Sequence, residues 1–293
     1  MRRFALALAL ALLVLPAGTA AGDGPSYVLF GWTGVTAPGL PYRYVTLPGS
    51  SETVLAAIRR SSGRVWSWRS LHGRWGVPMV ATDGTAGGLS RDHRLLVLGD
   101  WSPPLGAPRR TSRFLLVNPT SLRVWRTITL PGDFTFDALS PGGGTLYLIQ
   151  HLAGGQRGTR YRVRAYDIAA RRLLPRAIAD RRQSSWTMDG SPVTRATSAD
   201  GRWVYTLYRQ PGGSPFVHAL DAAARTAVCI GLPWKGDQDV LFSTRLGLDR
   251  AGRTLTLSTR RGRPLFAIDT RSFWVSRPRP RRGGLFSAIA RVL

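Results

Sequence analysis

The sequence predicts an all-β fold, and three observations support this prediction. A unit of short apolar strands and polar turns returns roughly every 50 residues. The turns are built from Ser, Asp and Gly, which cap the local backbone and accept the positive φ of tight hairpins. No stretch in the body of the chain shows helical periodicity. Among the 293 residues, 33 Gly and 20 Pro also favour many turns over long helices.

The N-terminus is predicted to be a secretory signal peptide over residues 1–21. Arg2-Arg3 is a short positive region, and residues 4–15 are apolar but too few to span a bilayer. Small residues follow, so we expect cleavage near Ala20 or Ala21 and export of the protein. The export route, Sec or twin-arginine, stays open.

Two kinds of turn recur in the rest of the chain. The first is of the Ser-x-Asp-Gly type, lies between two apolar strands, and repeats with spacings of 50, 58 and 51 at Ser90, Ser140, Ser198 and Asp249. The second ends a later apolar strand of each unit, at Asn118, Asp167, Asp221 and Asp269. Side-chain oxygens at these positions are expected to cap the turns.

Each unit therefore holds four short strands, and such a repeat is the signature of a β-propeller blade. The units cover residues 27–70, 76–130, 133–180, 186–234 and 243–277. They predict five blades in one domain over residues 24–277, with six or seven left open. An open ring would expose two sheet edges. We therefore expect the strand near Tyr27–Gly31 to complete the last sheet.

The segments SPGGGTLYL (140–148) and SADGRWVYTL (198–207), each followed by a strand ending in Asp, resemble a known repeat. They are similar to the SPDG-type repeats of YVTN-type and WD-repeat-like bacterial propellers, over about residues 50–275. The first unit lacks a clear turn of this type, and Asp249-Arg250-Ala251-Gly252 departs from it. Residues 186–234 also resemble exported actinobacterial proteins of unknown function. The resemblance implies a fold but no particular activity.

The formal net charge of +25 comes from arginine, because the chain contains one Lys, one Asn and one Glu. This bias is typical of a GC-rich genome and predicts arginines scattered over the whole surface. Nucleic-acid binding would require them on one face or groove. The composition disfavours such a partner and predicts a general affinity for anionic polymers or lipid headgroups.

No catalytic, cofactor-binding or metal-binding residue is predicted. The chain has no nucleophile elbow, zinc-protease motif or phosphate-binding loop. His72, His93, His151 and His218 are expected in loops or packing roles, and Glu52 in a loop. Cys229 is expected to be a small buried hydrophobe, with a nucleophile or an intermolecular bridge as alternatives.

Any carboxylate site is expected among the aspartates outside the repeating turns, namely Asp83, Asp133, Asp137, Asp189, Asp237 and Asp239. Asp237-Gln238-Asp239 could offer oxygen ligands to a cation, or simply be solvated. The tryptophans divide in two. Those in repeat strands should pack between blades: Trp66, Trp125, Trp203 and Trp274. Those in loops or at strand ends could stack on sugars or peptides: Trp32, Trp75, Trp101, Trp186 and Trp234.

Residues 278–293 form a basic linker and a short apolar tail, which could touch a membrane surface or pack on the rim. The sequence as a whole predicts an exported, monomeric, non-enzymatic propeller that binds a protein or an anionic envelope polymer. One alternative is an extracellular lyase or glycosidase acting on a polymer at the channel mouth. Another is a purely structural envelope component.

Overall fold

A computed structural model of the chain describes residues 28–29, 31, 33–101, 108–152, 160–180, 182, 187–210 and 212–278. Their regular structure is almost entirely β-strand, with one 3-10 helix, η1 (Asp239–Ser243), in the described part. The predicted all-β fold is confirmed. None of these residues forms a helix of the length and apolarity that a membrane span requires. The predicted signal peptide and residues 279–293 of the tail lie outside the described residues.

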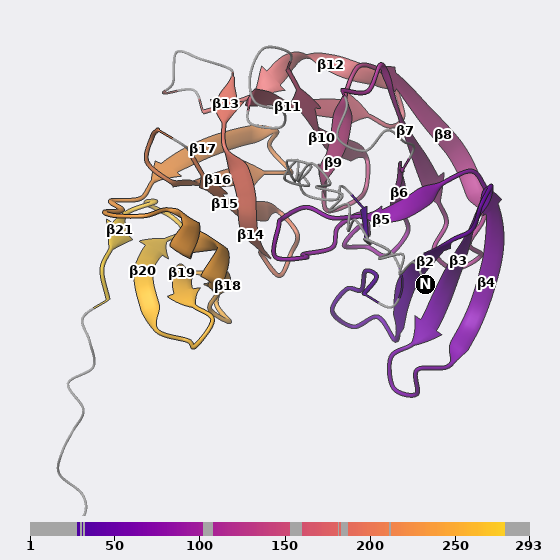
Figure 1. The fold of residues 1–293 in the computed structure, drawn as a ribbon, viewed down its shortest axis with the longest axis horizontal. Helices are drawn as coiled ribbons and strands as arrows, with labels where there is room; N and C mark the ends of the chain where they lie inside the picture. Colours follow the sequence, from indigo (N-terminus) through magenta and orange to yellow (C-terminus); the bar gives the residue numbers. More distant parts are fainter. Residues whose placement is uncertain are drawn as a thin grey trace, which may run out of the picture.

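The described strands form five antiparallel sheets that follow one another around an arc (Figure 1). The first sheet contains β2 (Tyr42–Pro48), β3 (Glu52–Arg59) and β4 (Val65–His72). The second contains β1 (Val28–Leu29), β5 (Trp75–Pro78), β6 (Leu96–Asp100), β7 (Thr111–Val117) and β8 (Val124–Pro131).

The third sheet contains β9 (Phe134–Leu139), β10 (Thr145–His151), β11 (Arg160–Asp167), β12 (Arg172–Ile178) and the short β13 (Met188–Asp189). The fourth contains β14 (Ser191–Thr197), β15 (Trp203–Arg209), β16 (Phe216–Asp221) and β17 (Thr226–Gly231). The fifth contains β18 (Thr244–Leu248), β19 (Thr254–Thr259), β20 (Pro264–Asp269) and β21 (Val275–Ser276). Most strands of each of the last four predicted units lie in one sheet, although β13 of the fourth unit pairs in the third sheet and β1 of the first unit pairs in the second. The arrangement is that of a β-propeller.

The hairpin between the two innermost strands is built as the sequence predicts. The hydroxyls of Ser90, Ser140 and Ser198 accept the backbone N–H five residues ahead, at 3.0, 2.9 and 2.8 Å. In the fifth sheet Asp249 Oδ1 accepts the N–H of Arg253 at 2.8 Å. A residue of positive φ completes each turn, at His93, Gly143, Gly201 and Gly252. These residues are therefore structural.

The hairpin before the outermost strand also repeats. A side-chain oxygen accepts backbone N–H groups two or three residues ahead, at Asn118, Asp167, Asp221 and Asp269. Positive φ recurs in all five copies, at Gly63, Leu122, Arg171, Arg225 and Phe273. The first copy has Arg59 where the others have Asn or Asp. Its turn closes through the N–H of Gly63 on the carbonyl of Arg59, at 2.8 Å.

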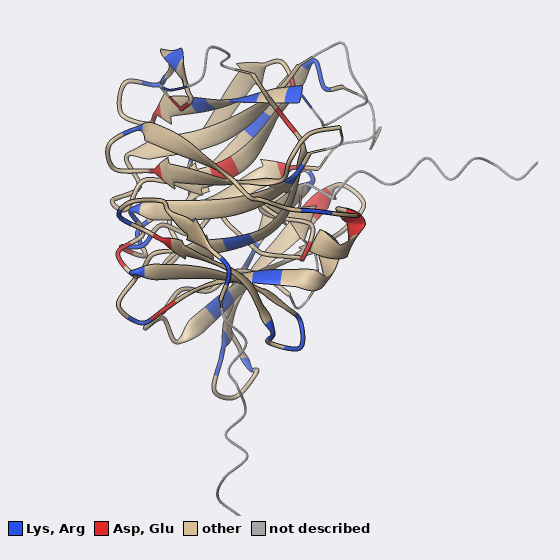
Figure 2. Ribbon diagram, turned by 90° about the vertical axis from the view of Figure 1, so that its left-hand side faces the viewer, with Lys and Arg blue, Asp and Glu red and all other residues tan. Residues whose placement is uncertain are grey.

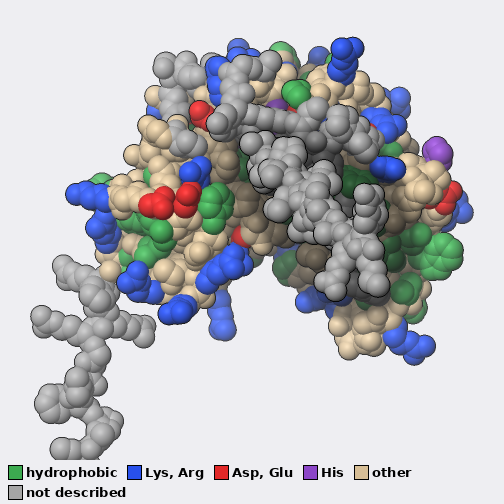
Figure 3. All heavy atoms as spheres, in the orientation of Figure 1, with side chains coloured by type: hydrophobic (Ala, Val, Ile, Leu, Met, Phe, Trp, Pro, Cys, Tyr) green, Lys and Arg blue, Asp and Glu red, His purple; other side chains and the backbone are tan. Residues whose placement is uncertain are grey.

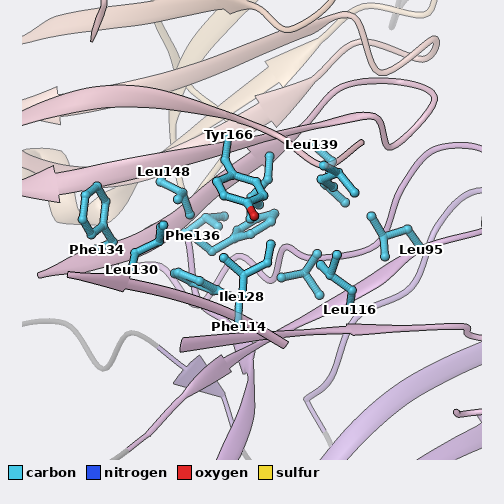
Figure 4. Packing of buried hydrophobic residues seen from close by; sticks show 14 residues of the cluster. Leu95, Phe114, Leu116, Ile128, Leu130, Phe134, Phe136, Leu139, Leu148 and Tyr166 are labelled. Carbon is cyan, nitrogen blue, oxygen red and sulfur yellow. The ribbon is translucent and has the colours of Figure 1, made fainter. Parts of the chain in front are cut away.

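Neighbouring sheets pack face to face through the apolar residues that alternate along their strands. Between the second and third sheets, Phe114, Leu116 and Ile128 lie against Phe136 and Leu148 (Figure 4). Burying one such side chain stabilises the fold by roughly 1.5–3 kcal/mol. Because each sheet contacts its neighbours through such a cluster, the core of the protein is a series of inter-sheet layers.

The first sheet departs from the others because its innermost strand is reduced to a single bridge, Val35 with Tyr44. The prediction that the N-terminal strand completes the last sheet is wrong, because β1 pairs with β5 instead. The physical reason is that Gly76 has no side chain. A Cβ added there would lie 2.5 Å from Val28 Cβ, so the glycine leaves the space that β1 occupies. Thr46 Oγ1 also donates to the carbonyl of Leu29, at 3.1 Å. Among the described strands, none therefore joins the first sheet to the fifth, and the two lie at opposite ends of the arc (Figure 1).

The connection between β5 and β6, residues 79–95, crosses the arc from the second sheet to the fourth and fifth; we call it the crossing loop (Figure 1). The N–H groups of Thr82 and Asp83 donate to the carbonyls of Pro192 and Val193 on β14, at 3.0 and 3.1 Å. Asp83 Oδ2 also accepts Arg245 Nη1 of β18, at 2.8 Å. Further along the same loop, Arg91 Nε donates to a carbonyl in the first turn of the fourth sheet.

Replacing Gly88 with alanine should destabilise the protein by on the order of 2 kcal/mol. Gly88 closes the crossing loop with a φ of +98°, and an added Cβ would lie 2.5 Å from the backbone oxygen of Val97. Gly84, at the tip of the same loop, has a φ of +85° but no atom within 4 Å of its would-be Cβ. The urea midpoint of Gly84→Ala should therefore lie between those of wild type and Gly88→Ala. Equal midpoints for the two variants would contradict this reading of the loop.

Candidate functional site

The non-repeating aspartates do not converge on a carboxylate site. Four of them bind arginines, and three of these pairs are Asp83 with Arg245, Asp133 with Arg109 and Asp239 with Arg209, at 2.8, 2.9 and 2.8 Å. Asp137 binds Arg195 through its carboxylate and its carbonyl. Asp237 caps the N–H of Asp239, and Asp189 lies in β13. No three His, Cys, Asp or Glu side chains of the described residues form a metal-binding group. Arginine therefore pairs with four of these six carboxylates.

A buried polar row crosses the interface between the third and fourth sheets. Arg195 lies opposite Thr206, Thr206 opposite His218, and His218 opposite Cys229, so all four share one face of the fourth sheet. Asp137 of β9 binds Arg195 at the inner end of the row. The side chains of this ion pair are only 6% and 4% exposed.

The outer end of the row carries a second carboxylate. Asp180 Oδ2 accepts the backbone N–H of Cys229 at 2.8 Å and Arg182 Nη2 at 2.6 Å. Burial alone would raise the pKa of Asp180, but these hydrogen bonds outweigh it and lower the pKa to about 2. His218 lies buried between the two ends, and desolvation lowers its pKa to about 4. At neutral pH the row thus holds an ionised Asp180 carboxylate and a neutral His218 imidazole.

The remaining histidines lie outside this row, and His72 is the exposed last residue of β4. His93 occupies a positive-φ turn position, and His151 Nε2 lies 3.0 Å from Thr135 Oγ1. Cys229 is half-buried in β17, with its side chain at the edge of the core between the third and fourth sheets. Glu52 was predicted in a loop, but it is the first residue of β3 and accepts a hydrogen bond from Ser70.

The prediction that repeat-strand tryptophans pack between blades is wrong for three of four. Trp66, Trp125 and Trp274 are 59%, 49% and 73% exposed. Only Trp203 packs inside, against Tyr205 and Phe273. The outermost strand of a sheet has no neighbouring sheet beyond it, so residues at its start face solvent. Periodicity alone does not distinguish this strand from the inner ones.

The loop tryptophans show the reverse pattern. Trp75, predicted as a stacking candidate, is 4% exposed, and its indole N–H donates to the carbonyl of His72 at 2.7 Å. Trp234 packs against the core of the fourth and fifth sheets, and Trp101 lies half-buried beside Arg74. Trp32 and Trp186 lie outside the described residues.

The exposed tryptophans of the first two sheets form, with arginines, what we call the outer-rim surface: Trp66, Trp68, Trp125, Arg59 and Arg126. Trp68, on β4, is 65% exposed. The Arg59 guanidinium lies 4.7 Å from the centre of the Trp66 ring, and that of Arg126 lies 4.8 Å from the Trp125 ring. Figure 3 shows hydrophobic side chains with Lys and Arg on the side of the molecule that carries β4.

Positive charge extends beyond this surface. Figure 2 shows Lys and Arg spread over strands and turns across the molecule rather than gathered in one groove. The expected scatter of arginines is therefore visible in the fold. What distinguishes the outer-rim surface is the combination of arginine with exposed indole rings.

No protein-family model and no curated protein matches the chain. Among solved structures it is similar to hydrazine synthase of Kuenenia stuttgartiensis, at 14% identity over 84% of this chain and 77% of that chain, with a TM-score of 0.41. It is also similar to the dihydro-heme d1 dehydrogenase NirN in complex with DHE, at 12% identity over 86% of this chain and 47% of that chain, with a TM-score of 0.49.

A third similar structure is the β-propeller domain of Cps50 (Swd1) from Myceliophteria thermophila. Identity is 13% over 81% of this chain and 64% of that chain, with a TM-score of 0.43. The chain spans about half of the dehydrogenase and under two thirds of the Cps50 domain. At such identities and TM-scores, these neighbours lend no activity, substrate or partner to this protein.

Proposed function

We propose that this protein is an exported, non-enzymatic β-propeller that binds a partner in the cell envelope through its outer-rim surface. The observation that carries the proposal is the contrast between two residue classes. Non-repeating carboxylates are mostly paired with arginine, whereas three tryptophans of the first two sheets face solvent. Exposed Trp beside Arg is the composition of binding surfaces.

The proposed export is supported by residues 1–21, which have the composition of a signal peptide. The five sheets are proposed to be its five blades, and the Ser-x-Asp-Gly turns support a place among YVTN-like bacterial propellers. N-terminal sequencing of chain recovered outside the producing cell tests the export step. The expected first residue lies just after Ala20 or Ala21. Retention of Met1 on that chain would contradict the predicted cleavage.

Removing both indoles, as Trp66→Ala with Trp125→Ala, should weaken sedimentation of the full chain with purified envelope material at least tenfold. Truncating two exposed anchors costs binding free energy, and about 1.4 kcal/mol corresponds to tenfold in affinity. Because both side chains are exposed, the fold should be kept, which circular dichroism checks.

Trp274→Ala is the matched control, since it removes an indole of greater exposure from the fifth sheet. It should bind within twofold of wild type. If the double variant sediments as wild type does, the outer-rim surface is not the binding site.

A further inference from the structure

The first two sheets carry the same surface motif, Ser-x-Arg-Val-Trp. It reads SGRVW at residues 62–66, entering β4, and SLRVW at residues 121–125, entering β8. The geometry repeats with the sequence. The second motif residue has a positive φ in both copies, and the arginine N–H lies 3.4 Å from the motif serine hydroxyl in both.

Packing does not require this repetition. The motif valines, Val65 and Val124, are 52% and 38% exposed. Both motif tryptophans are largely exposed, and the Trp66 ring also stacks on Tyr42 with 5.8 Å between ring centroids. The third and fourth sheets make the same turn with other residues entering the outermost strand, RLL at 172–174 and TAV at 226–228. The fold thus tolerates other side chains at a position where the first two sheets both expose Arg, Val and Trp. A repeated exposed motif points to a repeated ligand contact.

The arginines around the two motif copies carry positive charge that no carboxylate in the described part of the chain pairs with. Within the described residues, none of Arg59, Arg64, Arg123 and Arg126 has a carboxylate partner. By contrast, most non-repeating aspartates bind arginine. Each motif tryptophan therefore lies beside a guanidinium that no described carboxylate pairs with, Arg59 with Trp66 and Arg126 with Trp125. Arg126 Nη1 donates to the carbonyl of Ile168 at 2.6 Å, which fixes the guanidinium in place.

We propose that the two motif copies are equivalent subsites for an acidic polysaccharide. One sugar unit stacks its C–H face on Trp66 and a later unit on Trp125, while their anionic groups meet the neighbouring arginines. A polymer with a repeating unit matches two equal sites on adjacent sheets. A protein partner is expected instead to concentrate its anchors in one central cluster. The inference rests on the proposed binding function and adds the chemical class of the ligand.

Equilibrium binding of the full chain to four probes tests the assignment: polygalacturonate, dextran, poly-L-glutamate and oligo-dT. Polygalacturonate should bind at least tenfold more tightly than each of the other three. Trp66→Ala and Trp125→Ala should each lower that affinity about tenfold, because either change removes the avidity of a two-site contact. Trp274→Ala should stay within twofold of wild type.

Trigalacturonate offers only three sugar units to the two motif copies, so it should bind far more weakly than the polymer. If poly-L-glutamate binds as tightly as polygalacturonate, and the tryptophan variants bind it as wild type does, the contact is purely electrostatic and the proposal is overturned. Tighter binding of oligo-dT would replace the ligand class by a nucleic acid. If the double variant loses envelope sedimentation but polygalacturonate does not compete, the binding function stands and the polysaccharide assignment fails. If the variant keeps sedimentation, the binding function itself fails.

Discussion

Replacing Asp137 with alanine should lower the free energy of unfolding by about 3–5 kcal/mol, because it leaves a buried guanidinium without its counter-charge. Arg195 donates through Nη1 and Nη2 to Asp137, and neither side chain has appreciable access to water. Since small domains have total stabilities of about 5–15 kcal/mol, much of the population should unfold in moderate urea. Urea titration followed by tryptophan fluorescence measures the change.

The control for this prediction is an exposed ion pair of the same residue types. Asp239 binds Arg209 at 2.8 Å, but its side chain is 63% exposed. Asp239→Ala should cost less than about 1 kcal/mol. Replacing both buried partners, as Asp137→Leu with Arg195→Met, should recover part of the loss, because no charge is left unpaired. A loss below 1 kcal/mol for Asp137→Ala alone would contradict the buried-pair interpretation.

Lowering the pH from 6.5 to 4 should remove about 3 kcal/mol of stability through His218 alone. Desolvation lowers its pKa from 6.5 to about 4, with Asp137 and Asp180 opposing that shift and Arg195 adding to it. The unfolded chain binds a proton near pH 6.5, whereas the folded protein binds it only near pH 4. The stabilisation is therefore complete above pH 6.5 and is lost as the pH falls. Urea unfolding measured at half-unit pH steps follows this change.

His218→Leu should flatten the curve between pH 6.5 and 4, since leucine does not titrate. It should keep a second decline between pH 3.8 and about 2, where the depressed pKa of Asp180 is passed. We therefore expect wild type to lose stability in two separate pH ranges, of which His218→Leu removes the upper one and keeps the lower one. A variant curve that parallels wild type throughout would assign the acid sensitivity to other groups.

Much of the architecture could be predicted from the sequence, because the recurring turns are local. Ser198 caps a hairpin through a hydroxyl five residues from its donor, and Asp221 caps N–H groups two and three residues ahead. Such contacts depend on neighbouring residues, so a single sequence reveals them. This is why most strands of the last four sheets fall within the matching predicted units, whereas β1 and β13 pair outside their own units.

The features that the sequence did not predict depend on contacts between distant segments of the chain. The position of Val28 beside β5 depends on the fact that Gly76 has no side chain, and the strand pattern does not reveal this contact. Apolar alternation likewise does not show which strand of a sheet is outermost, so Trp66 and Trp125 were predicted inside. Their shared Arg-Val-Trp motif was the available signal, because the third and fourth sheets carry other residues after the same turn.

The crossing loop also bears on how the molecule unfolds. Arrays whose units touch only their neighbours lose structure one unit at a time from the ends. Here Asp83 reaches Arg245 across 162 residues, and Thr82 reaches Val193 across 111. The second sheet therefore cannot complete its contacts until the fourth and fifth sheets are in place. The sheets that this loop joins should consequently melt in a single transition.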